Sequence, residues 1–129
     1  MEEVLHGRIA VGHTDPRRTI YDLIRGGDAG GKQTLHNLAY FSPLKPGAHI
    51  GDHYHKKMWE TYLILSGTGT MHLRDQEGHK QRIPIESCPY MVTIPPYVGH
   101  TLVAGSQMTL LIAATGEPDP SDMIKMQVL

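Results

Sequence analysis

The sequence has little of several features that would mark a particular class of protein. Its one cysteine, Cys88, excludes an internal disulfide and suggests a reducing compartment. Its 12 basic and 13 acidic residues nearly balance, which argues against a nucleic-acid partner. Its apolar runs, such as residues 110–114, are too short to span a membrane. The acidic residues 1–3 do not resemble a signal peptide, so we expect a cytoplasmic protein with no membrane partner.

A long helical period of apolar residues is also missing, and short strand-like segments take its place. The chain has 129 residues, the length of one domain, and its 14 glycines and 9 prolines are spread as turn signals. Segments rich in Thr, Ile, Leu, Val and Tyr predict strands at residues 19–24, 35–41, 61–65, 70–73, 90–94, 100–103 and 108–113. Many short strands between regular turns predict an all-β sandwich or barrel.

Four of the residues that can bind metals stand in an informative pattern. His53 and His55 are two residues apart, so in a strand both side chains point to the same face. Glu60 follows after a short segment, and a turn there would bring it beside the histidines on the next strand. His100 comes much later, after two prolines and at the start of another predicted strand. Three imidazoles and a carboxylate suit a divalent metal such as Mn, Fe, Co, Ni, Cu or Zn.

The spacing around these residues resembles the first motif of the cupin family. Every defining position of that motif is present: Gly47-x5-His53-x-His55-x4-Glu60-x6-Gly67. The second cupin motif is partial, because only its proline and its histidine are kept, at Pro95 and His100. Three other residues stand where two glycines and an asparagine are usual: Pro89, Tyr97 and Ala104.

The resemblance implies an all-β double-stranded β-helix, or jelly roll, formed by a single cupin domain spanning residues 1–129. Its barrel core would cover about residues 36–114, with an N-terminal arm at 1–18 and a C-terminal tail at 115–129. The metal would lie inside the barrel near one mouth, held by His53, His55, Glu60 and His100, with Tyr97 narrowing that mouth. A cupin that keeps the fold and uses its pocket without metal is the alternative. The resemblance also implies a homodimer, with the N-terminal segment or residues 123–129 exchanged between subunits.

Two further residues are candidates for catalysis. Tyr62 shares a strand face with Glu60, so it is either a proton donor to substrate or a tyrosine of the barrel core. His49 lies in the segment that leads into the strand of His53, where it is either a proton shuttle or a solvated side chain. The sequence of the C-terminal tail leaves two structures open: residues from Ser121 onward form either a short helix or an extended arm packed on a partner.

Three functions fit this pattern. The first is metal-dependent isomerase, epimerase or lyase chemistry on a small oxygen-rich, sugar-like molecule, in which the metal polarises a carbonyl. Residues 94–101 also resemble part of the small sugar-nucleotide ketoisomerases, which generally work without metal and lack the full first motif. The second is an Fe- or Mn-dependent dioxygenase or oxidase of a small carboxylate, thiol or phenol, which needs the same four ligands. The third is a cupin that binds a small ligand without turnover.

Overall fold

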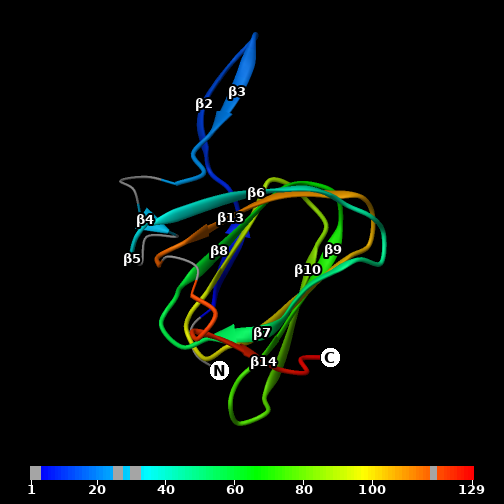
Figure 1. Cartoon of the computed structure of the whole chain (residues 1–129). Coiled ribbons are helices and arrows are strands. Elements are labelled where there is room, and N and C mark those ends of the chain that lie inside the picture. Colours follow the sequence, from blue (N-terminus) through cyan, green and yellow to red (C-terminus); the bar gives the residue numbers. More distant parts are fainter. Residues whose placement is uncertain (1–3, 25–27, 30–32, 117–118) are drawn as a thin grey trace.

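The computed structural model describes residues 4–24, 28–29, 33–116 and 119–129, and its strands form two five-stranded antiparallel sheets (Figure 1). The first sheet has the order β1 (Leu5–Arg8), β11 (Tyr90–Ile94), β8 (Glu60–Ser66), β13 (Met108–Ala114), β6 (Asn37–Leu44). The second has the order β10 (Lys80–Ile85), β9 (Gly69–Arg74), β12 (Gly99–Ala104), β7 (His49–His55), β14 (Met123–Lys125). The two sheets form a jelly roll, which confirms the predicted all-β double-stranded β-helix.

The hydrophobic core lies between the two sheets and follows the two-residue period of the strands. Tyr62 and Ile64 point into it from β8, Met71 and Leu73 from β9, and Leu102 from β12. Each of these side chains is at most 1% exposed. Burying a large apolar side chain contributes about 1.5–3 kcal/mol, so this alternation holds the sheets face to face.

No helix long and apolar enough to cross a membrane occurs in the part of the chain that the structure describes.

The seven predicted strands all overlap observed ones, but the structure contains others that the pattern does not indicate. One is β10, whose Pro84 argues against a strand in the sequence. The proline is tolerated because β10 is an edge strand. Its missing backbone N–H would face the open edge of the sheet, so no hydrogen bond between strands is lost. Another is β14. Of the two alternatives for the residues from Ser121 onward, the short helix is wrong: residues 120–122 form a turn, and the extended segment that follows pairs with β7 of its own chain.

Two short hairpins complete the fold. The first, β2 (Val11–Asp15) with β3 (Arg18–Tyr21), projects away from the barrel at the top of Figure 1. The second pairs β4 (Asp28–Ala29) with β5 (Gln33–Thr34). The projecting hairpin leaves large apolar side chains exposed, among them Val11 and Ile20. On β6, Leu38 and Tyr40 also face outward, because the alternate residues of that strand face the barrel interior.

Candidate metal centre

The four predicted ligands come together inside the barrel. His53 and His55 lie on β7 and His100 on the neighbouring β12, whereas Glu60 begins β8 in the opposite sheet. Each offers one ligand atom, and these atoms all lie within 4.8 Å of one another. The ring centroids of His53 and His100 are 4.8 Å apart, and those of His53 and His55 are 5.0 Å apart. The group therefore bridges the two sheets.

A bulge in β7 decides which of its side chains reach this group. His53 pairs with His100, but the next pair along is Gly51 with Thr101, so Asp52 is the extra residue and has a φ of 61°. The extra residue reverses the inward and outward alternation on its two sides. Gly51, with a φ of 124°, lies so close to β12 that an added Cβ would be 2.3 Å from the carbonyl oxygen of His100.

Glu60 is the centre of the contacts in the group. Its Oε1 atom lies 3.1 Å from Nε2 of His55 and 3.0 Å from Nε2 of His100. Glu60 is 8% exposed and His100 is 1% exposed, so water has little access to these atoms. Among the described residues, the buried side-chain atoms without a hydrogen-bond partner are His55 Nδ1, His55 Nε2, Glu60 Oε1, His100 Nε2 and Arg74 Nε.

All but one of those orphaned atoms belong to this group, and two of them, Nε2 of His55 and Nε2 of His100, converge on Oε1 of Glu60. Leaving buried nitrogen and oxygen atoms unpaired is costly, and one cation would pair with several of them together. Imidazole nitrogen and carboxylate oxygen are ligands of divalent transition metals. The residues present therefore fit the metal that the cupin resemblance implies.

The charge states of the group also suit a metal. Burial alone would raise the pKa of Glu60, but contacts with His100 and His55 outweigh it and hold that pKa well below its usual range. Burial, assisted by the nearby His100, lowers the pKa of His53 to about 4. Burial would lower the pKa of His55 as well, yet the contact with Glu60 outweighs it and the pKa is raised. At neutral pH Glu60 is therefore ionised and His53 is neutral, and the raised pKa of His55 favours a proton that a metal would have to displace.

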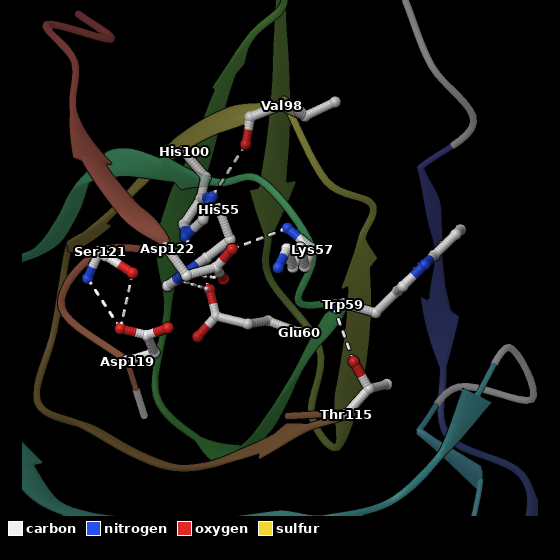
Figure 2. Close-up of polar contacts among 10 residues, drawn as sticks. All are labelled: His55, Lys57, Trp59, Glu60, Val98, His100, Thr115, Asp119, Ser121 and Asp122. Atoms are coloured by element: carbon white, nitrogen blue, oxygen red, sulfur yellow. Dashed lines mark hydrogen bonds and ion pairs between the residues drawn. The ribbon is translucent and has the colours of Figure 1, made fainter. Parts of the chain in front are cut away.

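The orientation of His100 is set by the backbone. Its Nδ1 lies 3.1 Å from the carbonyl oxygen of Val98, as Figure 2 shows. A carbonyl oxygen only accepts hydrogen bonds, so Nδ1 carries the proton and donates. Nε2 is then the nitrogen that faces Glu60, and it is the atom that would bind a metal.

Of the two residues predicted to act in catalysis, the structure places only Tyr62 beside this group. Its ring packs edge-on against His100, with the centroids 5.8 Å apart, and burial raises its pKa well above the usual range. Its proton therefore stays in place at neutral pH. His49 is exposed and begins β7 opposite Val103, on the far side of the bulge and on the outer face of the sheet. The structure does not bring His49 to the group.

A cavity of about 300 Å³ adjoins the group at His55 and Glu60. Its other walls come from β6, the β7–β8 loop, β13 and the C-terminal tail: Asn37, Ala39, Phe41, Met58, Ile112, Ala114, Asp119, Pro120 and Met123. That volume is at the small end of the range for small-molecule sites. No motif in the sequence marks these wall residues, because they come from separate elements.

Tyr97 does not narrow this cavity, contrary to the expectation from the sequence. Its ring is 49% exposed, packs near Tyr54, and lines a separate hollow of about 670 Å³ together with Trp59 and His79. Figure 2 shows Trp59 pointing away from Glu60. Tyr97 nevertheless keeps the backbone of the glycine that it replaces, with a φ of 68°, and its N–H donates to the carbonyl oxygen of His55 at 2.7 Å. The departure from the motif therefore changes the side chain and leaves the turn intact.

Asp122, in the tail, also contacts the group, and no pattern in the sequence marks it. Its Oδ2 atom lies 3.4 Å from Nδ1 of His55, and its side chain is almost fully buried. A carboxylate behind a metal-binding histidine is a common arrangement in metal sites. The sequence of residues 119–121 before it gives no signal of this contact, which depends on how the tail packs.

Solved structures similar to this chain have the same fold. No curated protein matches the chain. One solved structure similar to it is QdtA, a sugar 3,4-ketoisomerase from Thermoanaerobacterium thermosaccharolyticum in complex with TDP. The two are 18% identical, with 96% of this chain and 88% of that chain covered and a TM-score of 0.81. ChmJ, a 3'-monoepimerase from Streptomyces bikiniensis in complex with dTDP-quinovose, is 14% identical, with 95% and 68% covered and a TM-score of 0.77.

A third similar structure is CapF, a capsular polysaccharide assembling protein from Staphylococcus aureus. It is 19% identical, with 99% of this chain but 34% of that chain covered, and a TM-score of 0.63. These likenesses support a cupin-like jelly roll. The model of one sequence family, described as the polysaccharide biosynthesis C-terminal domain, matches residues 13–116, most of the chain. The protein therefore belongs to the polysaccharide biosynthesis C-terminal domain family.

Proposed function

We propose that this protein is a metal-dependent isomerase or epimerase of a small keto sugar, with a nucleotide-linked sugar as its substrate class. The observation that carries the proposal is the group of four ligand atoms within 4.8 Å of one another, beside a cavity. QdtA is a sugar ketoisomerase in complex with TDP, and ChmJ is an epimerase in complex with dTDP-quinovose, which supports this substrate class. The polysaccharide biosynthesis family supports it too.

Isomerisation and epimerisation next to a carbonyl share one chemical requirement. A proton must leave the carbon beside the carbonyl and a proton must return to a carbon or an oxygen. A metal held by His53, His55, Glu60 and His100 would supply a Lewis acid for the carbonyl oxygen. Tyr62 keeps its proton at neutral pH and is our candidate proton donor. The identity of the metal, whether Mn, Fe, Ni, Zn or Cu, is left to elemental analysis.

The test follows solvent deuterium into the substrate. The metal-loaded protein is incubated in D₂O with a TDP-linked 4-keto-6-deoxy sugar, and proton NMR follows the hydrogens beside the carbonyl. We expect their signals to be lost with turnover, and a chelator-treated sample to be inactive. Oxygen uptake with small carboxylates or phenols would favour the dioxygenase reading. Tight binding without exchange or oxygen uptake would favour a cupin that only binds its ligand.

Replacing Tyr62 with phenylalanine tests the proposed proton donor. The change removes only the hydroxyl, so the packing against His100 is kept and folding should be little affected. We expect kcat to fall about 100-fold, the lower range for loss of a general acid. The measurement is the deuterium exchange rate. His49→Ala, on the outer face, is expected to change the rate by less than about twofold. Unchanged kcat in Tyr62→Phe would make Tyr62 a core residue only.

We also propose that the protein forms a homodimer through the outer face of the first sheet. Leu38 is 52% exposed there, and beside it runs an apolar groove of about 430 Å³ lined in part by Tyr21, Leu63 and Leu111. An apolar surface of this kind is typical of a protein–protein contact. Tyr21, at the end of β3, lines this groove, and the β2–β3 hairpin is our candidate for the exchanged element.

Leu38→Asp tests the dimer. A charge in the centre of an apolar interface is expected to raise the dimer dissociation constant by at least about tenfold. The measurement is sedimentation equilibrium. Leu129→Asp is the control, since Leu129 is similarly exposed, at 47%, but lines a different groove beside β9 and β10. A wild-type monomer at all concentrations, or equal effects of both variants, would contradict this interface.

A further inference from the structure

Asp122 lies on the side of His55 opposite Glu60. Nε2 of His55 is 3.1 Å from Glu60, and Nδ1 is 3.4 Å from Oδ2 of Asp122. Figure 2 shows His55, Glu60 and Asp122 gathered close together. Asp122 is 7% exposed, so its charge is placed inside the protein rather than in solvent. One ring is therefore flanked by two buried carboxylates, one on each nitrogen.

The position of Asp122 is fixed by contacts that do not involve the side chain of His55. Its Oδ1 accepts a hydrogen bond from the backbone N–H of Lys57 at 2.8 Å, and its carbonyl oxygen accepts one from the N–H of Lys56 at 3.1 Å. Just after it, β14 pairs with β7, with Met123 opposite His55. These contacts tie the tail to the strand and loop that carry the site. They leave Oδ2 as the oxygen that faces the imidazole.

A neutral imidazole carries one proton, and its two carboxylate neighbours compete for it. If the proton lies on Nε2, it points at Glu60 and blocks the atom that would bind a metal. If it lies on Nδ1, it points at Asp122, and the Nε2 lone pair faces Glu60. The gap of 3.4 Å needs to shorten by about half an ångström to form a good hydrogen bond.

We propose that Asp122 is a positioning residue that holds the His55 proton on Nδ1 and so keeps Nε2 free to bind a divalent transition metal. The inference rests on the metal site in the proposed function. It gives the C-terminal segment a part in that site, because the backbone of residues 119–125 carries both the positioning carboxylate and a wall of the cavity. Val98 does the same for His100 through its carbonyl oxygen.

Asp122→Asn separates this role from a structural one. The asparagine oxygen can still accept the Lys57 N–H bond, so the turn and the tail are kept. Its NH₂ group then faces Nδ1 of His55. Because NH₂ donates, Nδ1 must accept, and the ring proton moves to Nε2. The fold is preserved, but the proton of the His55 ring moves from Nδ1 to Nε2.

The first measurement is the affinity for Zn²⁺, by competition with a chromophoric chelator at one fixed pH. We expect Asp122→Asn to bind Zn²⁺ about 10–100-fold more weakly than wild type. Asp75→Asn is the matched control, since Asp75 likewise accepts a backbone N–H, from Glu77, and contacts an imidazole, that of His79, away from this group. It should leave the affinity unchanged within about twofold. Equal Zn²⁺ affinities in wild type and Asp122→Asn would overturn the proposal.

The second measurement needs no metal. Long-range ¹H–¹⁵N NMR of the metal-free protein, at an alkaline pH where the imidazoles are neutral, reports which nitrogen of His55 carries the proton. We expect an Nδ1–H form in wild type and in Asp75→Asn, and its replacement by the Nε2–H form in Asp122→Asn. If wild type binds no Zn²⁺ yet shows this change, the proposed metal function fails and the positioning role stands. A His55 ring with the same proton position in wild type and Asp122→Asn would overturn the inference.

Discussion

Replacing His53 and His100 together with alanine is expected to lower the metal content from about one ion per chain to below about a tenth of that. The double variant removes two of the four ligands, and the remaining pair, His55 and Glu60, still contact each other at 3.1 Å. Two protein ligands bind a metal ion much more weakly than four. The loss of metal affinity should therefore exceed the loss caused by replacing a residue that only positions a ligand. Deuterium exchange on the keto sugar should be lost with the metal.

The measurement is elemental analysis of protein purified without a tag, before and after reconstitution with Mn²⁺, Fe²⁺ and Zn²⁺. His13→Ala with His79→Ala is the matched control, because it also removes two imidazoles but from exposed positions away from the group. Its metal content should equal that of wild type. Metal retained in the His53 and His100 double variant would place the site elsewhere. A wild type that takes up no metal under any condition would leave a metal-free ketoisomerase or a binding protein.

Gly51→Ala is expected to destabilise the protein by about 3 kcal/mol and to disturb the metal site at the same time. The added Cβ would be 2.3 Å from the carbonyl oxygen of His100 and 2.9 Å from Cα of Thr101, both backbone atoms. Backbone cannot rotate away as a flexible side chain can, so β7 and β12 must move apart. That movement separates His53 from His100, and metal affinity should fall with stability.

Urea unfolding of the metal-free protein measures the change in the free energy of unfolding, and Zn²⁺ competition measures the change in affinity. Gly78→Ala is the matched control. Gly78 also has a positive φ, of 90°, but an added Cβ there would meet nothing within 4 Å. It should cost only the conformational penalty, about 1–2 kcal/mol, and leave Zn²⁺ affinity unchanged. Equal losses of stability in the two variants would show that the strand contact at Gly51 carries no cost of its own.

The sequence by itself determined the fold class and the members of the candidate site. Alternating apolar residues separated by glycine and proline are sufficient to predict short strands, because side-chain direction repeats every two residues along a strand. The His53-x-His55 pair also follows from that local geometry. The late His100 is found through its place in the second motif, after Pro95. These features can be predicted because each depends on neighbours in the chain or on a motif that keeps its residues in order.

Only the tertiary structure decided which face each side chain takes and what lies behind it. The bulge at Asp52 puts His49 on the outer face, although simple alternation would place it with His53. The contact of Asp122 with His55 depends on β14 pairing with β7, and no short-range pattern encodes that pairing. Long-range contacts form where a segment gains most from burial and backbone pairing in the whole fold. A sequence can therefore name the candidate metal ligands, but it cannot show which carboxylate lies behind them.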